Sequence, residues 1–341
     1  MKKIAINGFG RIGRQFLKVA LQRAELEVVA INDLGEVDNL AYLLKYDSAQ
    51  RKSDSSIFTE KDGDKTYLVV DGKRINFIQQ KDPTMLPWRE LGVEIVVEST
   101  GFFTSYEKAK VHLEAGAKRV VISAPSEGEE GVDGRTCLMG INENELGALP
   151  ISSNGSCTTN SVSPVAQIMS ETVGIQKAFL NTVHGYTATQ KLVDSPDAKE
   201  WRRGRAAAQN ISPSTTGAAI SVTQVIKDLK GKFDGMATRV PVITGSLADF
   251  TFLAKRPTTV EELQEIFRNA SKEDRWKGIF TVSDEELVSS DIIGTKYASI
   301  VDLSFIKVVD DDFVKVIAWY DNEMGYTYSL VEHVVKVSNL L

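Results

Sequence analysis

Near its start the chain reads KIAINGFGRIGRQFLKVALQRAELEVVAIND, which is residues 3–33. The apolar run at 3–7 predicts a short buried strand, and the spacing of Ile12, Phe16 and Val19 predicts a helix that reaches about residue 25. Residues 28–33 are again apolar and predict a second strand. A glycine-rich turn joins the first strand to the helix, so the segment predicts a strand–helix–strand unit of a parallel sheet.

That turn carries the pattern G-x-G-x-x-G at Gly8, Gly10 and Gly13. Between a strand and a helix this pattern indicates a dinucleotide site. The first glycine permits the tight turn, the second lets the backbone approach a pyrophosphate, and the third lets the helix pack on the strand. Asp33, at the end of the second strand, can accept hydrogen bonds from ribose hydroxyls and would repel a 2′-phosphate, which favours NAD. The alternative is that the glycines serve only the turn.

The segment up to residue 150 continues this alternation of strands and helices. Asp71-Gly72 separates two short strand-like runs and is typical of a hairpin turn. A helical pattern at 106–115 lies between two β-branched runs, which predicts a parallel sheet with right-handed crossovers. Loops after such strands bind ligands in open α/β sheets. The predicted strands are 66–70, 74–78, 93–98 and 119–123, and the loops of interest are 99–101 and 123–125. The acidic, glycine-rich segment 127–134 predicts a solvated loop.

A second candidate site lies at residues 152–160, which read SSNGSCTTN and precede an apolar helical pattern. Cys157 is therefore expected where a strand or loop turns into a helix. Pro164 is expected in the first helical turn, where proline costs no hydrogen bond. Aligned backbone N–H groups favour thiolate over thiol, which makes Cys157 a candidate nucleophile. The alternative is a structural cysteine packed as a small hydrophobic residue.

The second half offers residues that suit acid–base chemistry and anion binding. His184 follows an apolar strand pattern and can pair with Cys157, although a lone histidine is more often structural. Arg239 lies in another such pattern, where a buried guanidinium needs an anionic partner. The hydroxyl-rich segment 213–219 can donate to a phosphate. Residues 191–210 predict a long ordered loop with a basic cluster at Arg202, Arg203 and Arg205. The alternative to a functional role for this cluster is a solvated face or interface salt bridges.

Consecutive strand patterns with fewer helices follow Cys157 and predict an α+β domain. The strands are expected at 179–183, 236–241, 242–255, 299–303 and 313–320, and helices at 222–229, 258–269 and 324–340.

Composition narrows the functional class. The 341 residues are 42% hydrophobic and 25% charged, which is typical of a soluble globular protein, and the net charge of −6 argues against a general nucleic-acid surface. No apolar run approaches the length of a membrane span. The strand pattern begins at once, so no signal peptide is expected. Two cysteines and three histidines show no metal-ligand spacing. A reducing cytoplasm fits this cysteine usage.

A set of motifs, in order and over nearly the whole chain, resembles the glyceraldehyde-3-phosphate dehydrogenase family. They are residues 5–14 with 31–33, 153–160, 184–187, 214–219 and 319–323. The resemblance implies an N-terminal Rossmann dinucleotide-binding domain of residues 1–156 and 323–341. It implies an α+β catalytic domain of residues 157–322 with a mostly antiparallel sheet. The activity implied is that of a cytoplasmic homotetramer of glycolysis, which converts glyceraldehyde 3-phosphate, NAD and phosphate to 1,3-bisphosphoglycerate.

The resemblance also implies roles for individual residues. Cys157 would be the nucleophile, forming a thiohemiacetal and then a thioester, and His184 would relay the proton. The dinucleotide would be held by Gly8, Gly10, Arg11, Ile12, Gly13, Asp33, Lys81, Ser123 and Asn322. The substrate phosphate would bind Thr187 and Arg239, and the attacking phosphate would bind Ser156, Thr158, Arg203, Thr216 and Gly217. No metal is implied.

Some positions depart from the family pattern without removing a catalytic group. They are Gly155, Ile220, Met324 and the pair Thr244-Gly245. The segments 34–35 and 43–48 resemble the corresponding segments of family members that can use NADP as well as NAD. Two other functions stay open, an erythrose-4-phosphate dehydrogenase and a non-catalytic NAD-binding interaction protein. Residues 184–187 and 215–217 fit the triose enzyme better, and the intact Cys157 and His184 argue against a non-catalytic protein.

Overall fold

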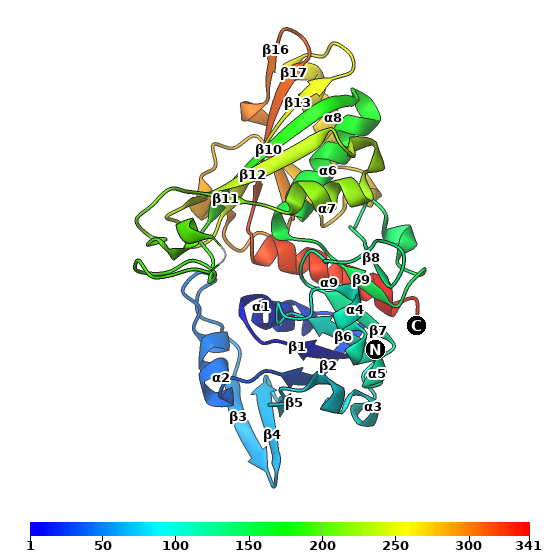
Figure 1. Cartoon of the computed structure of the whole chain (residues 1–341), viewed down its shortest axis with the longest axis vertical. Helices are drawn as coiled ribbons and strands as arrows, with labels where there is room; N and C mark the ends of the chain where they lie inside the picture. Colours follow the sequence, from blue (N-terminus) through cyan, green and yellow to red (C-terminus); the bar gives the residue numbers. More distant parts are fainter. Residues whose placement is uncertain (199) are drawn as a thin grey trace. The chain divides into compact units, whose positions relative to one another are not determined.

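The computed structural model describes residues 1–198 and 200–341 and divides into two compact units (Figure 1). The first unit comprises residues 1–137, 142–155 and 330–341, and the second comprises 138–141 and 156–329. None of the helices in the described residues has the length and apolarity that crossing a bilayer requires.

The first unit is a nine-stranded sheet with the strand order β3-β4-β5-β2-β1-β6-β7-β9-β8. Its strands are β1 Lys2–Asn7, β2 Leu26–Asn32, β3 Ile57–Asp62, β4 Lys65–Val70, β5 Lys73–Ile78, β6 Ile95–Glu98, β7 Arg119–Ile122, β8 Gly134–Thr136 and β9 Ile151–Ser153. Its helices are α1 Arg11–Ala20, α2 Val37–Lys45, α3 Trp88–Leu91, α4 Tyr106–Ala109 and α5 Val111–Glu114. From β5 to β8 every neighbouring pair is parallel, and β3, β4 and β5 form an antiparallel meander.

The predicted parallel sheet and the hairpin are confirmed. Asp71 and Gly72 have φ values of 47° and 80°, the left-handed pair that joins β4 to β5 with the twist a hairpin needs. The boundaries differ in places. Helix α1 ends at Ala20, because the chain must turn to place buried Leu26 at the start of β2. The expected helix at 106–115 is two short helices, and β3 and β8 were not predicted.

The segment 127–134 is more than a solvated loop. The carboxylate of Glu130 accepts hydrogen bonds from Tyr106 Oη at 2.6 Å and from the backbone N–H of Thr136 at 2.8 Å. These bonds fasten the segment to helix α4 and to strand β8, which begins at Gly134. The predicted solvated loop is present, with residues 127–129, 131 and 132 exposed, and local composition did not reveal that Glu130 anchors it.

The second unit is a sheet in the order β11-β12-β10-β13-β17-β15-β14, with β16 paired to β17. Its strands are β10 Ile175–Gly185, β11 Ser212–Thr215, β12 Phe233–Val240, β13 Ser246–Ala254, β14 Phe280–Ser283, β15 Ser299–Asp302, β16 Lys307–Val309 and β17 Phe313–Tyr320. Only β10–β12 and β14–β15 pair in parallel, so the predicted mostly antiparallel sheet is confirmed.

Helices α6 Cys157–Thr172, α7 Ala218–Val225 and α8 Val260–Ala270 pack beside this sheet (Figure 1). A cluster of buried apolar side chains from α6, α7, α8 and the sheet forms the core between them. The last helix, α9 Met324–Ser338, belongs to both units: its residues up to 329 are part of the second unit, and those from 330 on are part of the first.

Helix α6 carries the candidate nucleophile at its first residue, as the sequence predicted. Ser156 caps the helix, because its Oγ accepts a hydrogen bond from the Thr159 N–H at 3.1 Å. Placing Pro164 in the first turn was wrong. The helix begins at Cys157, so Pro164 lies in its interior and is buried. Packing of the apolar face therefore outweighs the hydrogen bond that proline removes.

Candidate active site

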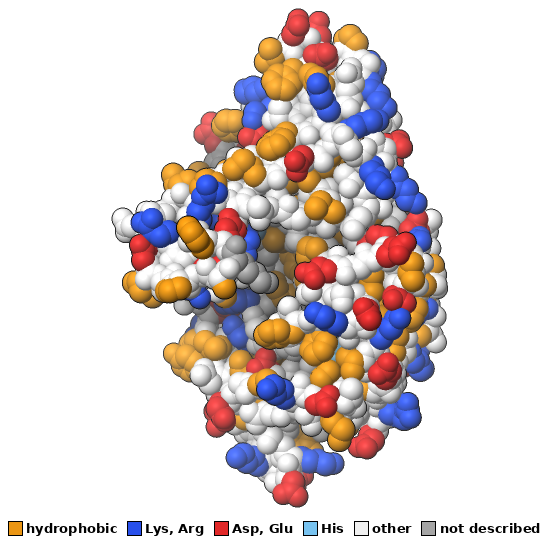
Figure 2. Space-filling model, in the orientation of Figure 1, with side chains coloured by type: hydrophobic (Ala, Val, Ile, Leu, Met, Phe, Trp, Pro, Cys, Tyr) orange, Lys and Arg blue, Asp and Glu red, His pale blue; other side chains and the backbone are white. Residues whose placement is uncertain are grey.

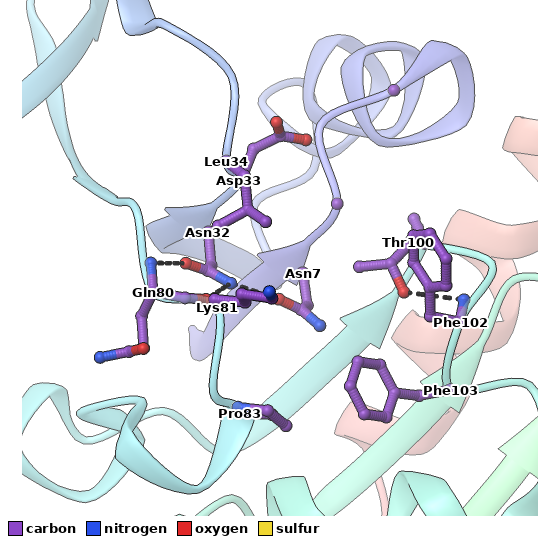
Figure 3. A pocket seen from close by; sticks show the side chains of 13 residues that line it. Asn7, Asn32, Asp33, Leu34, Gln80, Lys81, Pro83, Thr100, Phe102 and Phe103 are labelled. Atoms are coloured by element: carbon purple, nitrogen blue, oxygen red, sulfur yellow. Dashed lines mark hydrogen bonds between the residues drawn. The ribbon is translucent and has the colours of Figure 1, made fainter.

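A pocket opens in the first unit where β1, β2, β5 and β6 end. It is lined by Asn7, Gly8, Gly10, Asn32, Asp33, Leu34, Gln80, Lys81, Pro83, Ser99, Thr100, Phe102 and Phe103. These strands are parallel, so their carboxyl ends share one edge, which is where such sheets bind ligands. Figure 3 shows Asn32, Asp33 and Leu34 on one side and Thr100 and Phe102 on the other.

The three glycines of the turn fit a dinucleotide for separate reasons. Gly8 has a φ of 94°, and a Cβ there would lie 2.6 Å from the backbone nitrogen of Thr100. A Cβ on Gly13 would lie 2.1 Å from the carbonyl oxygen of Gly8, so α1 packs directly on the turn. A Cβ on Gly10 would meet nothing within 4 Å, which leaves open space at the helix N-terminus for a phosphate.

The other predicted cofactor residues are only partly gathered there. Asp33 lines the pocket and braces the turn, because its Oδ2 accepts the Phe9 N–H at 2.6 Å. Lys81 also lines the pocket. Arg11 instead bonds Asp47 at 2.8 Å, and neither Arg11 nor Ile12 lines the pocket. Ser123 reaches it only through a hydrogen bond of 3.1 Å to Ser99 Oγ.

Sequence reasoning missed a buried polar cluster behind this pocket. Glu98 accepts hydrogen bonds from Asn7 Nδ2 at 2.6 Å and from the Thr100 N–H at 2.7 Å, so one carboxylate fixes two residues of the pocket lining. His112 lies 3.0 Å from Glu98 through Nε2, and Trp88 Nε1 donates to His112 Nδ1 at 3.2 Å. The available signal was the acidic residue that ends the apolar strand β6.

In the second unit the structure brings Cys157 and His184 together. Cys157 Sγ lies 3.4 Å from His184 Nε2. The cysteine is partly exposed and the histidine is buried. The parallel register of β10 and β12 places Arg239 directly opposite His184. The predicted nucleophile, its proton partner and the predicted anion ligand therefore form one cluster.

The charge state at rest differs from the sequence expectation. Burial raises the pKa of the Cys157 thiol, and the nearby Arg239 charge and the Thr158 N–H oppose that rise. Burial, with the same Arg239 charge, lowers the pKa of His184 to about 3. The pair therefore rests as a thiol and a neutral imidazole. Burial therefore opposes the thiolate that the N–H groups at the helix N-terminus favour.

A small basic pocket lies beside this cluster. It is lined by Thr189, Gln190, Arg202, Arg203, Ser212, Pro213, Ser214 and Arg239. Glu200 contacts two residues of the pocket lining. The Glu200 Oε2 lies 2.8 Å from Arg203 Nε and accepts a hydrogen bond from Ser214 Oγ at 3.0 Å. Sequence reasoning named Arg203 and Arg239 but missed the carboxylate that occupies Arg203.

The remaining predicted phosphate ligands lie outside the lining of this basic pocket. Thr187 Oγ1 is 2.9 Å from Thr189 Oγ1. Thr158 Oγ1 is 2.9 Å from Tyr320 Oη, and Thr216 Oγ1 accepts the Ala218 N–H at 3.2 Å. Gly217 precedes helix α7, and Ser156 is engaged as the cap of α6.

Asn322 is held rigidly after β17. Its Oδ1 accepts hydrogen bonds from Thr244 Oγ1 at 3.2 Å, from the Gly245 N–H at 3.1 Å and from Ser246 Oγ at 2.8 Å. These donors fix the amide plane and leave its NH₂ group to donate. Two of them come from the Thr244-Gly245 pair, so this departure from the family pattern supports the Asn322 position.

A dinucleotide pocket in one unit and a partly exposed cysteine against a buried histidine in the other define a dehydrogenase with a cysteine nucleophile. Residues 2–106 match the family model "Glyceraldehyde 3-phosphate dehydrogenase, NAD binding domain", and residues 156–322 match "Glyceraldehyde 3-phosphate dehydrogenase, C-terminal domain". The chain belongs to the glyceraldehyde-3-phosphate dehydrogenase family. It is an oxidoreductase whose cofactor is NAD.

Curated relatives agree over the full length. Glyceraldehyde-3-phosphate dehydrogenase 1 of Kluyveromyces lactis is 45% identical over 338 residues, which cover 98% of this chain and 100% of the relative. The glyceraldehyde-3-phosphate dehydrogenase of Clostridium pasteurianum is 44% identical, with 99% of this chain and 100% of the relative covered. Glyceraldehyde-3-phosphate dehydrogenase 1 of Trichormus variabilis is 46% identical, with 98% and 96% covered.

Proposed function

We propose that this chain catalyses the phosphorylating oxidation of glyceraldehyde 3-phosphate to 1,3-bisphosphoglycerate with NAD. The observation that carries the proposal is the 3.4 Å contact between Cys157 Sγ and His184 Nε2 beside Arg239. NAD binding is assigned to residues 1–156 with 323–341, and the chemistry to residues 157–322. Glyceraldehyde 3-phosphate and inorganic phosphate are the substrates, in the glycolytic direction or its reverse.

The residues perform the chemistry in balanced steps. Cys157 Sγ adds to the aldehyde carbon while His184 passes the thiol proton to the aldehyde oxygen, which gives a thiohemiacetal. Bound NAD supplies the hydride acceptor. As hydride leaves the carbon, His184 accepts the hydroxyl proton and a thioester remains. Hydrogen phosphate then attacks the thioester carbonyl and loses its proton to water, Cys157 leaves as a thiolate, and His184 returns its proton to the sulfur.

Positioning comes from the surrounding side chains. We assign the substrate phosphate to Thr187 and Arg239. The attacking phosphate is assigned to Ser156, Thr158, Arg203, Thr216 and Gly217. Asn322 would donate its amide N–H to the nicotinamide carboxamide, since its Oδ1 is already occupied. Asp33 would accept from the ribose and favour NAD, although use of NADP as well stays within the proposal.

The test is the initial rate of NADH formation with and without phosphate, in three variants. Cys157→Ser should abolish turnover, and His184→Asn should lower kcat by about 10²–10⁴. Cys137→Ser is the matched control, because Cys137 is buried and burial raises the pKa of its thiol to about 12. Equal rates with and without phosphate would refute the phosphorylating step.

The erythrose-4-phosphate activity is the second candidate. It would be preferred if the specificity constant for erythrose 4-phosphate exceeded that for glyceraldehyde 3-phosphate. A chain that binds NAD but oxidises neither aldehyde would instead be a non-catalytic binding protein.

The chain is further proposed to act as a cytoplasmic homotetramer. Support comes from the segment that follows β10, where Leu192, Val193, Trp201 and Ile211 are each more than two-thirds exposed, at 81%, 71%, 87% and 72%. In Figure 2 the lobe at the left, which this segment builds, carries apolar and basic side chains together. Exposed apolar patches of this kind mark protein interfaces. Native mass spectrometry should give a tetramer, and Trp201→Asp should weaken it.

Both cysteines are free, which suits a reducing compartment such as the proposed cytoplasm.

A further inference from the structure

His184 Nδ1 lies between two groups that make opposite demands on it. Arg239 Nη1, a donor, is 2.6 Å away, and the carbonyl oxygen of Gly185, an acceptor, is also 2.6 Å away. Arg239 Nη1 is itself 3.2 Å from that carbonyl oxygen, so the guanidinium has a second place to donate. A nitrogen of a neutral imidazole either carries a proton or accepts one, and cannot serve both partners.

The protonation of His184 Nδ1 decides whether Nε2 presents a proton or a lone pair to Cys157 Sγ. When Nδ1 accepts from Arg239, the ring proton is on Nε2 and points at Cys157 Sγ, so no lone pair is available for the thiol proton. When Nδ1–H donates to Gly185, the Nε2 lone pair faces the sulfur and His184 acts as a base. A guanidinium at hydrogen-bond distance favours the first state, because a positive charge stabilises a lone pair and repels a proton.

The other groups around this cluster do not relieve the competition. Tyr320 packs edge-on against the His184 ring, with centroids 5.9 Å apart, and its hydroxyl bonds Thr158 and Thr182. Glu200 is bound to Arg203, at 2.8 Å. Among the described residues no carboxylate lies within ion-pair distance of Arg239, and the Glu200 charge acts on it only from farther away.

We propose that Arg239 holds His184 in the tautomer that cannot accept the Cys157 proton, and that a phosphate dianion bound by Arg239 releases it. The anion draws the guanidinium from Nδ1, the proton on Nε2 is lost to water, and a proton from water binds Nδ1 and donates to Gly185. His184 then becomes competent as a base only when the phosphate site is filled. This rests on the proposed function, in which the substrate brings the phosphate and its aldehyde together.

Nitrogen NMR of the full chain labelled with ¹⁵N-histidine reads the tautomer directly, without NAD or turnover. The His184 signals are assigned with His184→Asn. Adding phosphite dianion, with chloride at equal ionic strength as the control, should change His184 from the Nε2–H to the Nδ1–H pattern. Unchanged His184 signals at saturating phosphite would overturn the proposal.

Alkylation of Cys157 by iodoacetamide gives the kinetic counterpart, in a Cys137→Ser background. Phosphite should raise the alkylation rate near neutral pH by about tenfold or more. Arg239→Gln should raise the basal rate and abolish the response to phosphite, whereas Arg256→Gln, which changes an exposed residue paired with Glu262, should keep the response. A response that survives in Arg239→Gln would contradict the proposal.

The source of the anion is resolved by comparing phosphite with glycerol 3-phosphate. A lower half-saturating concentration for glycerol 3-phosphate would identify the substrate phosphate as the trigger, and a lower one for phosphite would identify inorganic phosphate. The proposed function has its own readout, phosphate-dependent NADH formation. The two proposals can therefore fail separately. A tautomer change without turnover would refute the proposed function and support this inference. Turnover without a tautomer change would support the function and refute this inference.

Discussion

Replacing Gly13 and Gly10 by alanine separates packing from ligand binding within one turn. A Cβ at residue 13 would lie 2.1 Å from the Gly8 carbonyl oxygen, more than 1 Å inside the distance of about 3.3 Å at which carbon and oxygen normally meet. Overpacking of this kind costs about 1–3 kcal/mol. Alanine recovers roughly 0.5–1 kcal/mol through helix propensity. The net loss for Gly13→Ala therefore lies between about 0 and 2.5 kcal/mol and centres on about 1 kcal/mol.

Gly10→Ala should behave differently. Its Cβ meets no atom within 4 Å, and its φ of −69° suits any residue. Replacing a glycine cap by alanine typically costs about 0.7 kcal/mol. The methyl group would, however, fill the space assigned to the pyrophosphate, so the Kd for NAD should rise by about tenfold or more.

Urea unfolding without NAD and calorimetric titration with NAD measure the two effects. We expect Gly13→Ala to lower the free energy of unfolding, with weaker NAD binding as a consequence, and Gly10→Ala to weaken NAD binding with only a small loss of stability. The reasoning fails if Gly13→Ala is as stable as the parent chain, or if Gly10→Ala binds NAD as tightly.

Three other perturbations test separate parts of the structure. Glu200→Gln removes the carboxylate that pairs with Arg203, so the KM for phosphate should fall about three- to fivefold in initial-rate assays, and an unchanged KM would mean that Glu200 does not compete with the anion. Burial lowers the pKa of His333 to about 3, so the folded chain keeps it neutral while the unfolded chain binds a proton below about 6.5. The free energy of unfolding should then fall by about 1.4 kcal/mol per pH unit from this residue as pH drops from 6.5 towards 3, and His333→Gln should show a shallower pH dependence in urea titrations. Thr259→Ala removes the hydroxyl that caps α8 by accepting the Glu262 N–H at 3.2 Å, and should lower the free energy of unfolding by about 1 kcal/mol in urea titrations. Thr258→Ala is the comparison variant. Thr258 is buried, so the effect of its replacement would not be confined to fraying of the helix end.

Local signals were sufficient for the elements that frame both sites. The glycine turn, the hairpin at Asp71-Gly72 and the helix start at Cys157 each follow from residues adjacent in sequence, and all three are present. The positions of β3 and β8 were missed, because a short strand such as β8 depends on pairing with β9 more than on its own residues.

The failures at the site have a common physical cause. The Glu98–His112 contact joins β6 to α5, and the Glu200–Ser214 bond joins a loop to β11, so neither can be deduced before the fold is known. The protonation state of Cys157 required its burial and the position of Arg239, which the helix N-terminus alone does not supply. Sequence reasoning therefore named residues that the fold brings together, Cys157, His184 and Arg239, but did not predict their electrostatic surroundings.

The most direct test of the chemistry is a single turnover without phosphate. The chain is mixed with glyceraldehyde 3-phosphate and NAD, quenched in acid and mapped by peptide mass spectrometry. We expect about one equivalent of NADH per active site and a matching acyl thioester on Cys157, which disappears when phosphate is added before the quench. An acyl group on Cys137, or NADH formation with no acylated cysteine, would contradict the account.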